Sequence, residues 1–177
     1  MNTKNILLSG FGGQGILFAG KFLAYWGLVD DKNVSWLPSY GPEMRGGTAS
    51  CSVIISDEPV GSPIVSKPDI LIAMNLPSLD KFEGTVAEGG IVIADSTLIE
   101  RSVLRSDVNA YHVPATAIAS EKAKQSLANM VILGKLLDVL GEFDEEKVRK
   151  VLSKIIPAKK ADMLEINLAA MKLGRDA

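Results

Sequence analysis

Three unbroken apolar runs indicate an α/β protein. Residues 6–8, 70–74 and 91–94 carry no polar alternation, which is typical of strands covered on both faces. The first run leads into residues 16–27, where small and apolar side chains recur at helical spacing. Strands that alternate with helices predict a mostly parallel sheet between two helix layers, a three-layer α/β/α fold of Rossmann-like type.

Residues 48–56 follow a different pattern, with apolar side chains at odd positions and mostly polar ones at even positions. Such alternation predicts a strand with one buried face. This pattern differs from the patterns of the other strands. The sheet is therefore either mostly parallel or mixed, with this strand antiparallel. Cys51, the single cysteine, lies in the apolar phase and is predicted to be a small core residue rather than a nucleophile.

The last third of the chain has the spacing of helices. Apolar positions between residues 126 and 140 follow a helical period, and Gly134 would allow a close approach on the same side. Asp144 precedes two glutamates and an apolar stripe, so it is predicted to cap a helix. The final helix is predicted to stop at Gly174, because glycine commonly follows the last helical residue.

Length and charge restrict the class of protein further. A chain of 177 residues has room for one domain with a substantial core and hardly for two, so residues 1–177 are interpreted as a single domain. A formal net charge of −2 provides no general basic field and argues against nucleic acid or anionic membrane as partners. No apolar run is long enough to cross a bilayer and no leader is evident, which favours a cytoplasmic location.

The glycines after the first strand form the most distinctive turn. Gly10, Gly12 and Gly15 match the pattern G-x-G-x-x-G between a strand and a helix, with Gly13 and Gln14 inside it. Glycines allow positive φ and close backbone approach, and free N–H groups at a helix start favour an anion. Two interpretations stay open: a turn that accommodates phosphate, or glycines that only let the helix pack tightly on the sheet.

A dinucleotide is the first ligand to consider for this turn, but one requirement is missing. An NAD site needs an acidic residue at the end of the second strand, about 20 residues on, to hold the ribose hydroxyls. Asp30 and Asp31 fall near that spacing, but they precede the next apolar run at residues 34–37 instead of ending it. The sequence therefore gives little support to an NAD site.

The segment 38–47 is a second candidate, because two prolines and three glycines fix its path. Its site candidates are Tyr40, Glu43, Arg45, Gly46 and Gly47. Arg45 can contact a carboxylate or phosphate through two parallel hydrogen bonds. An ion pair between Arg45 and Glu43 is slightly favoured over ligand contact.

Parallel strands bring these candidates to one edge. The turn, Tyr40, Asn75 and Asp95 all follow predicted strands, and ligands of α/β sheets bind at the carboxyl ends of strands. Asp95 is equally plausible as a helix cap. His112 has no Ser, Cys or acidic partner nearby in the sequence and is interpreted as structural or peripheral. We therefore predict no catalytic residue and no metal site on this chain.

The two candidate segments together resemble a known family. The glycine turn at residues 10–15, the loop at 39–47, and the segments 53–56 and 67–69 resemble the gamma subunits of 2-oxoacid:ferredoxin oxidoreductases. The resemblance covers nearly the whole chain, and the pair of motifs is far more specific than the glycine pattern alone. The loop looks most similar to 2-oxoglutarate-type enzymes, with branched-chain 2-ketoacid and pyruvate enzymes behind.

The resemblance implies the fold of the gamma domain of pyruvate:ferredoxin oxidoreductases and a reaction shared among subunits. A 2-oxoacid is decarboxylated on thiamine diphosphate with magnesium, electrons pass through iron–sulfur clusters to ferredoxin, and the acyl group leaves on coenzyme A. By resemblance, alpha and beta subunits, and in some complexes a delta subunit, would be the partners of this chain. The chain itself would bind no cofactor and would be inactive alone, since one cysteine cannot hold a cluster.

Two alternative hypotheses assign this chain to other classes of protein. A pure assembly module would bind its partners without any ligand contact at Gln14 or Arg45. A free-standing NAD(P)-binding enzyme of Rossmann type would use the glycine turn for the cofactor. In the favoured hypothesis, Gly12–Gly15 and Tyr40–Gly47 form the surface that docks on the catalytic subunits and faces the site, with Arg45 neutralising a phosphate or carboxylate.

Overall fold

The structure, a computed structural model, describes residues 2–39 and 48–177. Its strands are β1 (Thr3–Phe11), β2 (Asn33–Ser39), β3 (Thr48–Ser56), β4 (Ile70–Ala73), β5 (Ile91–Asp95) and β6 (Asn109–Val113). Its α-helices are α1 (Ile16–Leu28), α2 (Leu76–Phe82), α3 (Ala115–Lys122), α4 (Ala128–Val139), α5 (Glu145–Ile155) and α6 (Asp162–Arg175). Three short 3₁₀ turns cover Glu83–Thr85, Gln125–Leu127 and Ala158–Lys160.

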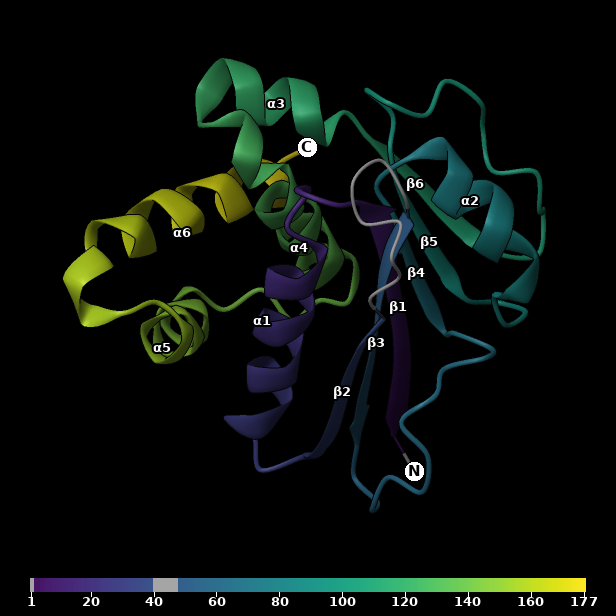
Figure 1. Cartoon of the computed structure of the whole chain (residues 1–177), viewed down its shortest axis with the longest axis horizontal. Helices are drawn as coiled ribbons and strands as arrows, with labels where there is room; N and C mark the ends of the chain where they lie inside the picture. Colours follow the sequence, from purple (N-terminus) through teal and green to yellow (C-terminus); the bar gives the residue numbers. More distant parts are fainter. Residues whose placement is uncertain (1, 40–47) are drawn as a thin grey trace.

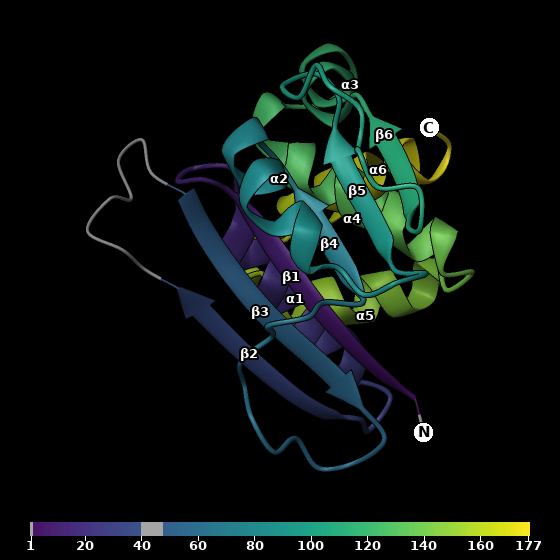
Figure 2. The ribbon, with the colours of Figure 1, turned by 90° about the vertical axis from the view of Figure 1, so that its right-hand side faces the viewer.

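The described strands form one sheet in the order β2-β3-β1-β4-β5-β6. β1, β4, β5 and β6 pair in parallel, whereas β3 pairs antiparallel with both β1 and β2. The expected α/β class is confirmed, and the sheet is mixed because the alternating strand at residues 48–56 is the antiparallel one. Figure 2 shows β2 and β3 side by side at one edge of the sheet.

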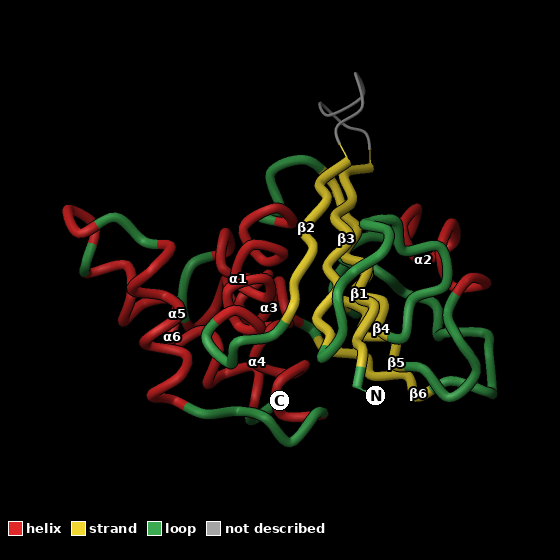
Figure 3. Tube along the Cα trace, turned by 90° about the horizontal axis from the view of Figure 1, so that it is seen from below, coloured by secondary structure: helices red, strands yellow, loops and turns green. Residues whose placement is uncertain are grey.

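Helices cover the two faces of the sheet unequally. Figure 1 places α1, α4, α5 and α6 on one side and α2 on the other. Seen from below, the yellow strands of Figure 3 separate the larger group of red helices from α2 in the same way. The three layers are therefore present, with a thick layer on the α1 face and a thin one on the α2 face.

The unbroken apolar strands are explained by two cores, one on each face. Ile6 and Leu8 belong to the larger core beneath α1 and α4, whereas Leu7 between them belongs to the smaller core beneath α2. Ile72 and Leu71 of β4 divide in the same way. Successive strand residues point to opposite faces, so a strand buried on both faces needs apolar side chains at every position.

Glycines on α1 let this helix lie close to the hairpin. A Cβ atom at Gly20 would come within 2.4 Å of the Cys51 sulfur, and one at Gly27 within 2.9 Å of Ile55. Cys51 is fully buried, which confirms its prediction as a core residue. Burial raises the pKa of its thiol from 9.0 to about 11, because a thiolate would be desolvated there.

Of the two predictions about the ends of α5 and α6, one is confirmed and one is wrong. Asp144 caps α5 as predicted, since its side chain accepts a hydrogen bond from the Lys147 N–H at 3.1 Å. The predicted stop at Gly174 is wrong, because α6 continues to Arg175. Gly174 instead packs against α4, where a Cβ atom would come within 1.7 Å of the Val131 carbonyl oxygen. Close packing between helices, rather than helix termination, requires glycine there.

None of the helices in the described ranges is both long enough and apolar enough to span a membrane.

Candidate functional site

The carboxyl ends of β1 and β4 mark the place where a sheet of this topology is expected to have its binding crevice. The two strands are parallel neighbours, and the helices that follow them, α1 and α2, lie on opposite faces of the sheet. Such a switch point is where α/β sheets commonly bind ligands. The predicted break at Gly10 is wrong by two residues, because β1 continues through Gly10 to Phe11 and pairs with β3. Only Gly12–Gly15 forms the turn.

The Gln14 side chain holds this turn in place. Its amide oxygen accepts a hydrogen bond from the Phe11 N–H at 2.6 Å, and its amide nitrogen donates to the Met74 carbonyl at 3.1 Å. The Gln14 N–H also donates to the Phe11 carbonyl at 3.2 Å. Gln14 therefore connects the end of β1 to the end of β4 across the crevice.

Gly10 and Gly15 serve packing. A Cβ atom at Gly10 would come within 2.6 Å of the Gln14 side-chain oxygen and 2.8 Å of the Met74 Cβ. One at Gly15 would come within 2.4 Å of the Asn129 amide nitrogen, which donates to the Gly15 carbonyl at 3.0 Å. Asn129 is buried and ties α4 to the start of α1. These contacts support the packing interpretation for these two glycines.

Gly13 differs from Gly10 and Gly15, because no atom of the described chain would contact a side chain there. It is exposed, has φ of +93°, and a Cβ atom there would meet nothing within 4 Å. Gly15 also has positive φ, at +74°. Within the described part of the chain, the N–H groups of Gly13 and Gly15 donate to no acceptor. N–H groups at the start of a helix favour an anion.

Asn75 and Asp95 do lie at this edge, and both have structural contacts. The Asn75 oxygen caps α2 by accepting the Ser78 N–H at 2.9 Å, while its amide nitrogen is buried without a partner among the described residues. The buried Asp95 carboxylate accepts hydrogen bonds from the Thr97 N–H at 3.1 Å and from the Thr116 hydroxyl at 2.5 Å. Thr116 lies in the first turn of α3, so Asp95 acts as a cap from a neighbouring strand, as one of its two interpretations predicted.

A cavity of about 340 Å³ lies over the turn, near the starts of α1, α3 and α4. The sequence-based prediction missed its hydroxyl and amide groups from Thr116, Gln125 and Ser126, although Thr116 follows β6 at the same carboxyl edge. No charged side chain lines it among the described residues. The described residues that line it are Gly13, Gln14, Leu98, Thr116, Gln125, Ser126 and Ala128.

The other residues considered from the sequence are those of the segment 40–47, His112 and possible metal ligands. Tyr40, Glu43, Arg45, Gly46 and Gly47 lie outside the described residues, although the strand before them, β2, runs parallel to β1 and ends at the same edge. His112 accepts a hydrogen bond from the Val103 N–H at 3.2 Å, in agreement with a structural role. Within residues 2–39 and 48–177, no three His, Cys, Asp or Glu side chains gather closely enough to hold a metal ion.

Fold and site together define an α/β protein of the doubly wound class whose crevice adjoins an antiparallel hairpin. The chain belongs to the pyruvate ferredoxin/flavodoxin oxidoreductase family, whose model it matches over residues 5–177.

Two relatives illustrate the range of names in this family. Ketoisovalerate oxidoreductase subunit VorA from Methanothermobacter thermautotrophicus is 43% identical over 172 residues, covering 97% of this chain and 35% of the relative. 2-Oxoglutarate synthase subunit KorC from Methanocaldococcus jannaschii is 41% identical over 157 residues, covering 87% of this chain and 84% of the relative. The chain thus spans about a third of the length of VorA. The expectation that 2-oxoglutarate relatives would rank first is not supported, since VorA is slightly more similar.

Solved structures agree with the fold. The gamma subunit of a keto/oxoacid ferredoxin oxidoreductase from Geobacter sulfurreducens PCA has a TM-score of 0.82 and 28% identity, covering 98% of this chain and 96% of that one. The 2-oxoglutarate:ferredoxin oxidoreductase from Magnetococcus marinus, solved with 2-oxoglutarate, coenzyme A and succinyl-CoA, has a TM-score of 0.88 and 25% identity. This chain aligns over 99% of its own length with 31% of that longer chain.

Proposed function

We propose that this chain is the gamma-type subunit of a 2-oxoacid:ferredoxin oxidoreductase complex. The complex would decarboxylate a 2-oxoacid oxidatively, transfer the acyl group to coenzyme A and reduce ferredoxin. The observation that carries the proposal is the family match over residues 5–177. The similarity to KorC supports a separate subunit of this kind, because it extends over 84% of that relative.

In the proposed complex, the redox cofactors belong to other subunits. An iron–sulfur cluster needs several thiolates, whereas the only thiol of this sequence, Cys51, is fully buried between α1 and β3 and retains its proton at neutral pH. The residues of this chain therefore do not fit a cluster. Alpha and beta subunits would supply thiamine diphosphate, magnesium and the clusters, and ferredoxin would meet the complex there.

The role proposed for this chain is to complete the walls of the shared site. The Gly13–Gly15 turn with its available N–H groups and the adjoining cavity would face the catalytic subunits, together with the segment that contains Tyr40, Glu43 and Arg45. The family structure from Magnetococcus marinus, which holds coenzyme A, supports a search for coenzyme A contacts at this edge. Arg45 would neutralise a phosphate or carboxylate.

Two substrates are the leading candidates. Relatives named for ketoisovalerate and for 2-oxoglutarate are similarly close to this chain, at 43% and 41% identity. Relatives named as pyruvate synthase subunits are more distant, at 28% identity. The complex is proposed to act on a branched-chain 2-oxoacid or on 2-oxoglutarate.

The test is an anaerobic purification through a tag on this chain in its native host. The eluate would be assayed for coenzyme A-dependent reduction of a viologen dye with ketoisovalerate, 2-oxoglutarate and pyruvate. We expect larger subunits to co-purify and one of the first two substrates to be oxidised fastest. A chain that purified alone and without activity would contradict the proposal.

A second candidate, an assembly module without ligand contacts, is favoured by one observation. The amide of Gln14 is engaged by the Phe11 N–H and the Met74 carbonyl, so it is not free for a ligand. Arg45→Ala separates the two functions, because the assembly module predicts unchanged Michaelis constants and turnover in the assembled complex. Lys154→Ala, at an exposed position on α5, is the matched control.

A free-standing NAD(P)-binding enzyme is disfavoured by the topology. In a dinucleotide-binding sheet the acidic residue for the ribose ends a parallel strand beside β1. Here that neighbour is β3, which runs antiparallel and begins at the carboxyl edge instead of ending there. Saturable binding of a reduced nicotinamide to the purified chain would revive this alternative.

A further inference from the structure

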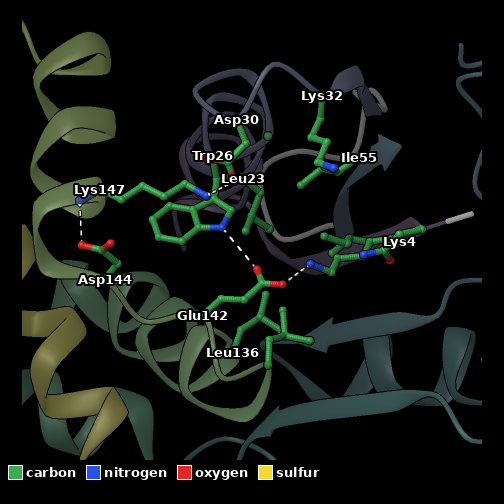
Figure 4. A pocket seen from close by; sticks show the side chains of 14 residues that line it. Lys4, Leu23, Trp26, Asp30, Lys32, Ile55, Leu136, Glu142, Asp144 and Lys147 are labelled. Atoms are coloured by element: carbon green, nitrogen blue, oxygen red, sulfur yellow. Dashed lines mark hydrogen bonds and ion pairs between the residues drawn. The ribbon is translucent and has the colours of Figure 1, made fainter. Parts of the chain in front are cut away.

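A second cavity, of about 430 Å³, lies at the opposite end of the sheet from the glycine turn. It is bounded by the first residues of β1, the end of α1 and the connection between α4 and α5, as Figure 4 shows. Its volume is within the range of about 300–1,000 Å³ that is usual for small-molecule sites.

The interior of this cavity is apolar. Ile6, Leu23 and Leu136 lie beneath it and are almost completely covered by the core, at 1% exposed or less. Apolar surface toward the opening comes from Leu140, which is partly exposed. Ile55 from β3 and the indole of Trp26 from α1 complete this wall. An aliphatic group of a few carbons would be covered on several sides there.

The rim of the cavity carries charges of both signs. Lys4 is opposite Ile55 in the β1–β3 register, and Lys32 lies two residues before Val34, which is opposite Ile55 from the other side. Both residues line the cavity near the amino end of β1, and the Lys32 ammonium is paired with Asp57. Glu142 and Asp30 approach from the other sides of the opening.

These charges are paired, but they retain hydrogen-bonding capacity. Glu142 accepts from the Lys4 ammonium through one oxygen and from the Trp26 indole N–H through the other, at 3.4 Å. Asp30 pairs with Lys147 at 2.5 Å, and the Lys147 ammonium lies 3.8 Å from the centre of the Trp26 ring. An ammonium has three donors and each carboxylate oxygen has two lone pairs, so a ligand could bind without breaking these pairs.

We propose that this cavity binds a small zwitterion with an aliphatic side chain, that is, an apolar α-amino acid. Its carboxylate would bridge the ammonium groups of Lys4 and Lys32, and its ammonium would donate to Glu142. Its side chain would lie against Ile55, Leu140 and the indole of Trp26.

The mixed charges decide between this ligand and simpler ones. A phosphate or dicarboxylate would bring a second negative charge close to Glu142 and Asp30, which like-charge repulsion disfavours. A 2-oxoacid would place a carbonyl oxygen, an acceptor, where the Glu142 carboxylate needs a donor. A simple amine would leave the two lysines without a new partner. Of these ligand types, the zwitterion is the one that places a negative group beside the lysines and a positive group beside the carboxylates.

A consequence for regulation rests on the proposed function. An α-amino acid and a 2-oxoacid of the same carbon skeleton are interconverted by transamination. A chain that belongs to an enzyme consuming branched 2-oxoacids would then respond to the corresponding amino acids at a position remote from the reaction.

The binding claim is tested on the purified full chain by isothermal titration calorimetry, which requires no enzymatic activity. The probes are L-valine, L-leucine, glycine and 3-methyl-2-oxobutanoate, the 2-oxoacid of valine. We expect saturable binding of L-valine or L-leucine, with glycine weaker because it has no side chain. Lys32→Met and Glu142→Gln should each weaken binding by about tenfold or more through loss of a charge-assisted hydrogen bond. Lys122→Met, at an exposed position at the end of α3, should leave binding unchanged.

Three outcomes would overturn the proposal. They are no saturable heat with any amino acid, equal affinity for glycine and L-valine, or preference for the 2-oxoacid over the amino acid. Lys32 forms an exposed ion pair with Asp57, so Lys32→Met is expected to fold, and its thermal unfolding curve checks this. Failure of this test leaves the subunit proposal standing, because that proposal is judged by co-purification and dye reduction.

Discussion

The contact between α4 and α6 predicts an unusual response to a glycine-to-alanine change. Gly134 of α4 faces the Met171 carbonyl of α6, and Gly174 of α6 faces the Val131 carbonyl of α4. Gly134 lies three residues after Val131, and Gly174 lies three residues after Met171. The two helices therefore approach each other reciprocally through backbone atoms, with no side chain between them.

Gly134→Ala is the perturbation. Its Cβ atom would lie 1.9 Å from the Met171 oxygen, whereas Cβ contacts below 3.0 Å are essentially never seen, so the helices must separate by about 1.1 Å. Overpacking of this kind costs about 1–3 kcal/mol. Separation also loosens Leu168 and Met171, and complete exposure of such a side chain would cost about 1.5–3 kcal/mol. The higher helix propensity of alanine offsets about 1 kcal/mol. Since only part of the exposure cost applies, the net destabilisation is about 1–4 kcal/mol.

Urea unfolding followed by far-UV circular dichroism measures this effect. With a slope of about 2 kcal/mol per molar urea, the midpoint should fall by about 0.5–2 M. Gly84→Ala is the matched control, since a Cβ atom there meets nothing within 4 Å, and its midpoint should be unchanged or slightly higher. A midpoint for Gly134→Ala that equals or exceeds the parent value would refute the close approach of the two helices.

Three further predictions concern the fold and the turn. Gln14→Met removes the two side-chain hydrogen bonds that Gln14 makes with Phe11 and Met74, so the free energy of unfolding should fall by about 1–3 kcal/mol. Gln125→Met, at an exposed position, is the control. Equal urea midpoints for the two variants would contradict the connection of β1 to β4 through Gln14. Asp144→Ala removes the cap of α5 and should cost about 1 kcal/mol in urea unfolding, whereas Asp138→Ala, on an exposed helical turn, should cost less. Cys51, with a thiol pKa of about 11, should resist iodoacetamide at pH 8 until urea unfolds the chain, as mass spectrometry would reveal. The native state keeps the thiol proton of Cys51, while the unfolded chain loses it near pH 9. The free energy of unfolding should therefore be unaffected below pH 9 and fall between pH 9 and 11 by up to about 1.4 kcal/mol per pH unit. The same decline in a Cys51→Ala variant would exclude this cause.

Most of the secondary structure could be predicted because its signals are local. Apolar runs without alternation indicated β1, β4 and β5, and the helical period indicated α1 and α4. Asp144 was identifiable as a cap because a cap acts on the N–H three residues later. Such features depend on neighbours in the sequence, so the sequence contains them directly.

Gly174 shows where local reasoning fails. A glycine near the end of an apolar helical pattern is expected to stop the helix, yet here it lies inside α6 because another helix backbone lies against it. The chain gives no local signal for that contact, since Val131 precedes Gly174 by more than forty positions. Gln14 is similar, because its link to Met74 depends on the parallel pairing of β1 with β4.

For function, the sequence by itself determined the family, since the glycine turn and the match over residues 5–177 depend on residue identity and spacing. Only the tertiary structure decided which glycines serve packing and that an antiparallel strand flanks the crevice. It also brought Lys4 and Glu142, which are 138 positions apart, to the rim of one cavity. The physical reason is that a cavity forms where separate elements fail to fill space, and that depends on how the sheet and its helices pack together.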